Sequence, residues 1–168
     1  MARSFDEIAV RAWVLAALAP YAPAAEVIYS DQRGERPEKP YVTVLKVSAP
    51  GYGEKERSYT PQDAPSVDAD FTIKQRRLAT FRVTVYGDDH DQLAMLIDDS
   101  TDDDVISDAN RASGITVAYA LSGPIRLSRN TNGVTEDRTT TDYAVRLITS
   151  RTRTQTDLID KAIATPEE

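Results

Sequence analysis

The sequence has no cysteine and only one histidine, His90. The absence of thiols excludes a disulfide-stapled scaffold, thiolate catalysis and Cys-ligated zinc, and a single imidazole cannot build a His-rich metal site. Aromatic residues make up only 7% of the chain, and no apolar run approaches the ~18 residues that would span a bilayer. With 168 residues, of which 40% are hydrophobic and 28% charged, the chain is predicted to form one globular domain.

Basic residues are also in short supply. The chain has 20 Lys and Arg against 27 Asp and Glu, and the resulting net charge of −7 argues against a dedicated DNA-binding role. The acidic excess is local, because residues 88–108 hold nine Asp and no Lys or Arg, which leaves the rest of the chain at +2. This pattern indicates a subunit whose charge is polarised, with an acidic face that pairs with another face.

A helix is predicted over residues 5–19, where apolar residues recur at spacings of three and four. Ser4 and Glu7 have the spacing of a capping box, and Pro20 ends the pattern. A second apolar stripe, which includes Trp13, either packs inside one domain or meets a neighbouring subunit. Acidic residues ahead of the apolar run argue against a secretory signal peptide.

The remaining pattern predicts an α+β fold. Strands are predicted at residues 27–29, 41–48, 71–87, 115–121, 125–128 and 138–150. After the third of these, Leu93, Leu96 and Ile97 mark one helix, and a shorter helical piece ends at Gly114. We expect a mixed, largely antiparallel sheet with the N-terminal helix and a central helix pair packed on it. Repeated Pro and Gly predict a long loop excursion at about 49–70.

The predicted α+β domain occupies residues 1–150. A C-terminal extension, rich in Thr and Arg, follows over residues 151–168, and a weak helix is predicted within it at 157–164. No internal repeat and no clear linker is present in the sequence.

The acidic run is the densest cluster that could support chemistry. Its centre consists of Asp98, Asp99, Asp102, Asp103 and Asp104. A calcium loop starting at Asp98 would need Gly at its sixth position and Glu at its twelfth, and the chain has Asp103 and Ala109 there. The cluster is either a solvated or docking face or a divalent-metal site. No G-x-S-x-G elbow accompanies His90, and no Walker sequence is present, so hydrolase chemistry and phosphate cradling are unsupported.

Arginine residues gather on the long predicted strand at 71–87 and toward the end of the chain, where several alternate with threonine. They are Arg76, Arg77, Arg82, Arg126, Arg129, Arg138, Arg146, Arg151 and Arg153. Such a pattern is typical of a solvated or edge-protecting strand face. The alternative is a head-to-tail contact in which the acidic helices of one subunit meet the basic strands of the next, closing a ring.

Residues 27–44, VIYSDQRGERPEKPYVTV, are similar in arrangement to one known family. A strand runs into a Gln-containing loop, and a Pro-x-x-Pro-Tyr segment leads into the next strand. FRVTVYG at residues 81–87 and the strand and Gly-Pro step at 115–125 continue the match. The chain resembles the phage neck terminator family over residues 5–150, and Gln32, Pro37, Pro40 and Tyr41 are the most specific positions. The Asp-dense stretch at 98–104 and the extension after residue 150 depart from the pattern.

The resemblance implies a structural virion protein of a tailed bacteriophage. Members look like tail terminators, which form a ring, commonly a hexamer, that caps the tail tube and joins it to the head connector. The implied partners are further copies of the chain, the tail tube protein, the head-tail connector and the tail sheath, with DNA only as cargo passing through the lumen. Neither catalysis nor a cofactor is implied, and the implied location is the virion, assembled in the bacterial cytoplasm.

The candidate residues for subunit or ring contacts combine the motif with the charged clusters. They are Trp13, Gln32, Pro37, Pro40, Tyr41, Arg76, Arg77, Arg82, Asp98, Asp99, Asp102, Asp103, Asp104, Arg146, Arg151 and Arg153. Two alternative functions stay open. One is another head-tail completion or tail-tube-associated protein, and the other is a divalent-metal-dependent enzyme that uses the Asp cluster.

Overall fold

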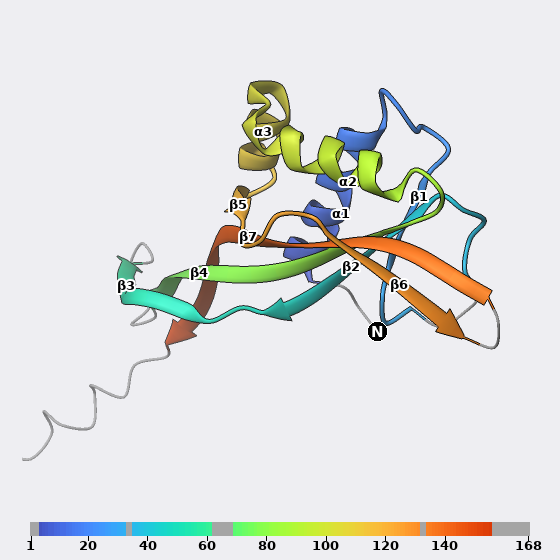
Figure 1. Ribbon diagram of the computed structural model, residues 1–168. Helices are drawn as coiled ribbons and strands as arrows, with labels where there is room; N and C mark the ends of the chain where they lie inside the picture. The colour runs from blue at the N-terminus through green and yellow to red at the C-terminus, as the bar shows by residue number, and fades with distance from the viewer. Residues whose placement is uncertain (1–3, 33–34, 62–68, 132–133, 156–168) are drawn as a thin grey trace, which may run out of the picture. The chain divides into compact units, whose positions relative to one another are not determined.

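The computed structural model describes residues 4–32, 35–61, 69–131 and 134–155 (Figure 1). In chain order the elements are α1 (Phe5–Leu18), β1 (Glu26–Tyr29), β2 (Tyr41–Ser48), β3 (Gly51–Pro61), β4 (Ala69–Tyr86), α2 (His90–Asp99), the 3-10 turn η1 (Ser100–Asp102), α3 (Asp104–Ala112), β5 (Ile115–Ala120), β6 (Ile125–Thr131) and β7 (Val134–Gln155). The α+β class, with an N-terminal helix and a central helix pair, is confirmed. Within the described residues, no helix is long and apolar enough to cross a membrane.

The strands form a mixed sheet in the order β1-β2-β4-β7-β5, with β3 also paired to β4 and β6 to β7. The β1–β2 pair is parallel, and the β2–β4, β5–β7 and β6–β7 pairs are antiparallel. The chain divides into two compact units. One comprises Met1–Pro50 and Arg77–Leu147, and the other comprises Gly51–Arg76 and Ile148–Glu168.

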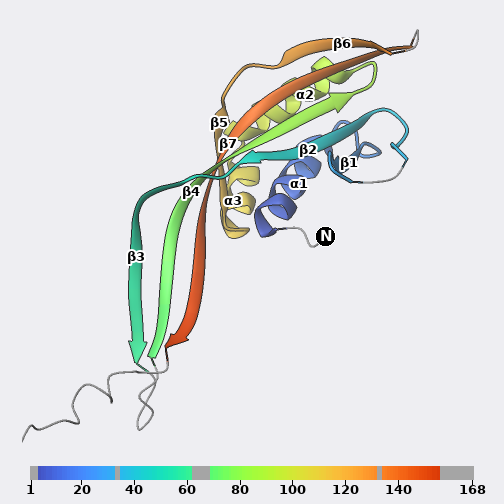
Figure 2. The same ribbon diagram turned by 90° about the horizontal axis from the view of Figure 1, so that it is seen from below.

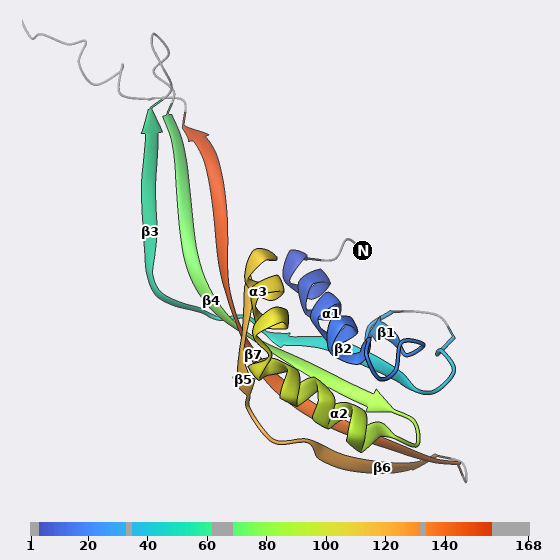
Figure 3. The ribbon, with the colours of Figure 1, turned by 90° about the horizontal axis from the view of Figure 1, so that it is seen from above.

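The core of the first unit lies between the helices and one face of the sheet (Figures 1 and 3). Val42 and Val44 of β2 and Phe81, Val83 and Val85 of β4 are at most 2% exposed. Their period of two places them all on the same face of the pleated sheet. The facing helices contribute apolar side chains to the same cluster, namely Val10, Trp13, Val14, Leu18, Leu93 and Ile97.

Helix α1 begins as the sequence predicts and ends at Leu18, one residue before the predicted end. The predicted capping box is present, because Glu7 Oε2 accepts from the Ser4 backbone N–H at 2.9 Å. Trp13 is 1% exposed, lies edge-on to Tyr143 and donates from Nε1 to Ser100 Oγ at 3.0 Å. The second apolar stripe therefore packs inside its own subunit.

The second unit contains β3, the first part of β4 and the end of β7, which run side by side (Figures 2 and 3). The predicted loop over 49–70 is wrong, because residues 51–61 form a strand and β4 begins at Ala69. Pairing with β4 satisfies the backbone of β3. The described side chains of β3, residues 51–58, are all exposed, so the strand needs no alternation of apolar and polar residues. Without that alternation, the sequence pattern does not predict a strand here.

Strand β7 is longer than predicted at both ends. It spans Val134–Gln155, so residues 151–155 of the predicted extension continue the strand. The helix predicted at 157–164 lies outside the described residues, as do Asn132 and Gly133 of the turn between β6 and β7.

Candidate interaction surfaces

The sheet of the first unit has a second face, opposite the helices, which we call the open face. In β4 the side chains of Arg82, Thr84 and Tyr86 alternate with the buried Phe81, Val83 and Val85, and therefore point to it. Cross-strand partners lie on the same face, so Leu45, the partner of Arg82, also belongs to the open face. Arg138 of β7 lies on this face too, together with its β6 partner Leu127, with Ile125 two residues before Leu127, and with Tyr119 of β5. No helix of the described chain packs on this side (Figure 1).

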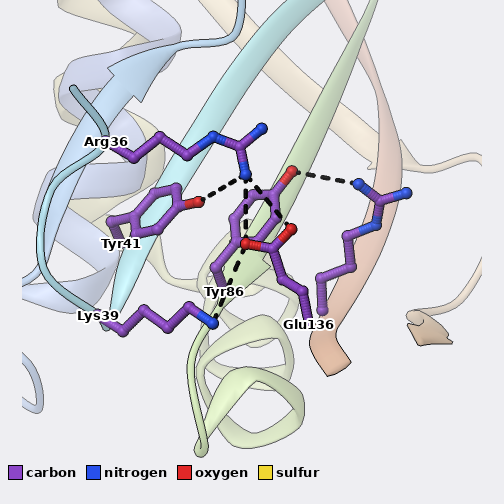
Figure 4. Close-up of polar contacts among 6 residues, drawn as sticks. Arg36, Lys39, Tyr41, Tyr86 and Glu136 are labelled. Atoms are coloured by element: carbon purple, nitrogen blue, oxygen red, sulfur yellow. Dashed lines mark hydrogen bonds and ion pairs between the residues drawn. The ribbon is translucent and has the colours of Figure 1, made fainter. Parts of the chain in front are cut away.

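At one end of the open face, Tyr41 and Tyr86 are cross-strand partners whose rings stack (Figure 4). Their centroids lie 4.6 Å apart at an interplanar angle of 12°. The Arg36 guanidinium lies 5.7 Å from the Tyr86 centroid and donates from one amino group to the Tyr41 hydroxyl at 3.4 Å. Burial raises the pKa of Tyr41, so its hydroxyl stays protonated. The arrangement holds the segment before β2 against β4.

Glu136 and Arg138 of β7 complete this cluster. The Glu136 carboxylate accepts from Arg36 at 3.2 Å and lies 4.0 Å from the Lys39 ammonium (Figure 4). Arg138 donates to the Tyr86 hydroxyl at 3.4 Å, and its guanidinium lies 6.0 Å from that ring's centroid. The cluster therefore joins three segments that are about 50 to 100 residues apart in the chain.

The two halves of the sequence motif meet here as well. Gly87 has a φ of +125°, and a Cβ at this position would lie 3.1 Å from Pro40 Cα. Only glycine suits both the conformation and the close approach. Pro37 and Gln32 line an adjacent pocket of about 340 Å³ with Tyr29, Arg36 and Tyr86 among its other residues. The Pro-x-x-Pro-Tyr and Tyr-Gly segments thus form one structural unit.

A groove of about 360 Å³ lies on the open face. It is lined by Arg82, Thr84, Ser122, Ile125, Leu127, Arg138, Thr140 and Asp142. Asp142 accepts two hydrogen bonds from Arg82, at 2.7 and 2.8 Å, and this carboxylate raises the pKa of Arg82. Ile125 and Leu127 are 51% and 40% exposed, so the groove combines apolar and charged groups.

The acidic residues lie on and between α2 and α3, on the helical side. Asp103 caps α3 by accepting from the backbone N–H groups of Val105 and Ile106 at 2.8 and 3.1 Å. Burial, together with the charges of Asp99 and Asp102, raises the pKa of the half-buried Asp98. The nearby Tyr143 hydroxyl acts in the opposite direction and lowers this pKa, but its effect is smaller. Within the part of the chain that the structure describes, no three acidic or histidine side chains are grouped to hold a metal ion.

A comparison with protein-family models matches residues 7–167 to the phage neck terminator protein family. The chain belongs to this family. A search of curated proteins gives no significant match. The protein is therefore a structural component of the phage neck, and its place is the virion. The resemblance drawn from the motif residues is confirmed.

Two of the contact residues expected for this neck terminator are buried within its own subunit. Trp13 and Tyr41 are 1% and 2% exposed, so neither presents a surface to a neighbour. Trp13 is buried in the core against Tyr143, and Tyr41 is buried against the stacked Tyr86 ring and Arg36. Pro40 is exposed, and Gln32 is exposed beside its pocket.

The arginines of the neck terminator do not form one basic face. Arg82 pairs with Asp142, Arg76 pairs with Glu56 at 3.4 Å, and Arg77 donates to the Ala49 carbonyl at 2.9 Å. Arg146 is exposed on the open face. The side chains of Arg151 and Arg153 lie outside the described residues, although β7 includes their backbone.

Sequence reasoning missed a buried polar network that anchors α2 of the neck terminator. His90 is 2% exposed, and its Nδ1 lies 2.6 Å from Thr139 Oγ1 and 2.9 Å from the Asp91 carboxylate. Thr139 also donates to Asp91, and Arg126 lies 3.4 Å from the same carboxylate. Thr139 and Thr141 alternate along β7 with residues that point outward, so both face the core. This alternation could have predicted the network, because polar side chains that face a core need buried hydrogen-bond partners.

Proposed function

We propose that this neck terminator assembles into a homomeric ring, a hexamer, that caps the tail tube and joins it to the head connector. The observation that supports the proposal is the family match over residues 7–167. The ring acts as a structural stop and a joint and performs no catalysis. Its partners are other copies of the chain, the tube protein and the connector, with the sheath as a further neighbour and DNA as passing cargo. Assembly takes place in the bacterial cytoplasm.

The open face supplies the physical reason for assembly. Leu45, Tyr119, Ile125 and Leu127 are 37%, 48%, 51% and 40% exposed there. Exposed apolar groups gathered on one face are typical of a surface that becomes buried in a complex. Our sequence candidates other than Trp13 and Tyr41 remain proposed contacts. They are Gln32, Pro37, Pro40, Arg76, Arg77, Arg82, Asp98, Asp99, Asp102, Asp103, Asp104, Arg146, Arg151 and Arg153.

The proposal is tested by measuring the mass of the purified protein, alone and with tube protein, by mass photometry, followed by electron cryomicroscopy of any assembly. A closed ring that binds one end of the tube is expected. A strict monomer that ignores both tube and connector contradicts the proposal.

A phage that lacks the gene separates this role from that of another head-tail completion protein. Loss of a terminator leaves tubes of uncontrolled length, because nothing stops tube growth. Tubes of normal length that merely fail to join heads would assign the protein to head completion instead.

A further inference from the structure

We infer that the groove on the open face of one subunit receives the acidic α2–α3 surface of a second copy of this chain. The inference rests on the proposed ring and names the contact that builds it. The groove and the acidic surface both lie in the first unit, on opposite sides of its sheet. The three helices occupy one side, and the groove occupies the other (Figures 1 and 3).

The open face has positive charge that the subunit leaves uncompensated. Arg82 is neutralised by Asp142, and Arg36 by Glu136. Among the described residues, no carboxylate lies within ion-pair distance of Arg138, which lines the groove, or of Arg146 farther along β7. The half-buried Arg138, which donates to the Tyr86 hydroxyl, therefore lines the groove without a carboxylate partner, and Arg146 is exposed farther along β7 without one.

The helical side has the complementary excess. Asp91 is paired with Arg126, Asp108 with Arg111, and Asp103 is used as the cap of α3. The carboxylates of Asp99, Asp102 and Asp104 are exposed, and no cation in the described chain lies within ion-pair distance of them. This set of three is the negative counterpart of the two arginines.

Apolar groups accompany the charge on both surfaces. Met95 of α2 and Val105 of α3 are 60% and 80% exposed. Ile125 and Leu127 offer them apolar area in the groove. Burying these side chains supplies the driving force, and the opposite charges select the orientation.

The contact is heterologous because each subunit presents the acidic surface on one side of the sheet and the groove on the other. Subunits then join head to tail. Such a contact closes into a ring when a whole number of identical rotations between neighbours completes one full turn. A symmetric dimer would leave one of the two surfaces unused on each subunit.

The test uses full-length protein with charges reversed on one surface at a time. The groove variant carries Arg138→Glu and Arg146→Glu, and the helix variant carries Asp99→Lys, Asp102→Lys and Asp104→Lys. Each variant alone presents like charges at the contact and is expected to lose the ring. A single chain with all five changes has both signs inverted and is expected to recover it. Circular dichroism and thermal melting confirm that each variant is folded.

A matched control reverses two exposed cations elsewhere, Lys55→Glu and Arg57→Glu on β3, and is expected to keep the ring. A second variant, Ile125→Asp with Leu127→Asp, places unpaired charge in the groove and is expected to give monomers. These side chains are already about half exposed, so the fold should tolerate the change.

The outcomes separate this inference from the proposed ring. If the wild type is a ring and neither reversal disturbs it, the groove contact is wrong and the ring stands. If the groove reversal leaves the ring intact but blocks tube or connector binding, the groove belongs to that partner and the inference is overturned. A monomeric wild type overturns both.

Discussion

At the scale of single residues, the ion pair between Asp6 and Lys46 shows how one polar contact ties α1 to the sheet. The carboxylate of Asp6 is 2% exposed, and its Oδ2 lies 2.6 Å from Lys46 Nζ. Burial alone would raise the pKa of Asp6, but the hydrogen bonds from Lys46 and Ser4 and the charge of Lys46 lower it overall. A carboxyl whose folded pKa lies below its unfolded value stabilises the fold at neutral pH.

The substitution Asp6→Asn is therefore expected to lower the free energy of unfolding near neutral pH by about 1.5–3 kcal/mol, the usual value of a charged hydrogen bond. The contribution of Asp6 is present above the unfolded pKa, about 3.9, and is lost as the pH falls through the lower folded value. Urea unfolding of wild type and variant at neutral and acidic pH measures the difference. It should shrink in acid, and a constant difference would mean that Asn disturbs packing instead. Glu54→Gln, at an exposed site on β3, is the control.

At the scale of elements, the short helix α3 depends on its cap. The nine residues Asp104–Ala112 are too few to form a stable helix alone, so end effects and packing determine its stability. We expect Asp103→Ala to cost about 1 kcal/mol, because two backbone N–H groups lose their acceptor. Chemical denaturation measures the loss, and amide exchange at Val105 and Ile106 should accelerate. Asp103→Asn keeps a capping oxygen and should retain most of the stability.

Strand β3 differs from α3 because it is held by backbone pairing, and none of its described side chains is buried. Its residues 51–58 are all exposed, whereas Phe81, Val83 and Val85 of β4 are buried. Local opening is easiest where little apolar area is buried. In the isolated protein we expect the amides of residues 51–58 to exchange with deuterium faster than those of residues 81–85. Equal protection of the two segments would contradict this prediction.

At the scale of the whole molecule, charge is segregated by element. The nine Asp of residues 88–108 contrast with a net charge of +2 in the rest of the chain. Salt screens charges over about 8–10 Å at physiological strength, and more steeply above it. Assembly through oppositely charged surfaces should therefore weaken as sodium chloride is raised, and the apolar contact should keep it from vanishing. Sedimentation velocity across a salt series measures this.

The variant with Ile125→Asp and Leu127→Asp, which is expected to be monomeric, provides the reference for the salt series. Its stability to unfolding at each salt concentration shows any effect of salt on the subunit itself. Assembly that strengthens with salt would show that apolar burial dominates and that the charges do not orient the contact.

Sequence periodicity identified most elements, because local spacing reports which face of an element is apolar. Helix α1 and strand β2 were predicted within one residue, and α2, α3 and β5 lie where the apolar spacing places them. The same reasoning missed β3, whose charged residues carry no alternation, and which forms only because β4 pairs with it. It also placed Trp13 and Tyr41 at a subunit contact, where the structure buries both.

The sequence by itself determined the α+β class, the family and the separation of acidic residues from the rest, since each depends on local pattern. Only the tertiary structure decided which charges remain available. Arg36 meets Glu136, which is 100 residues away, and Arg82 meets Asp142, which is 60 residues away. Such pairs depend on strand order and register, and these are set by how distant segments bury apolar faces together. The groove, the two arginines of the open face that have no carboxylate partner in the described chain, and the exposed carboxylates on the helical side become visible only after those pairs have formed.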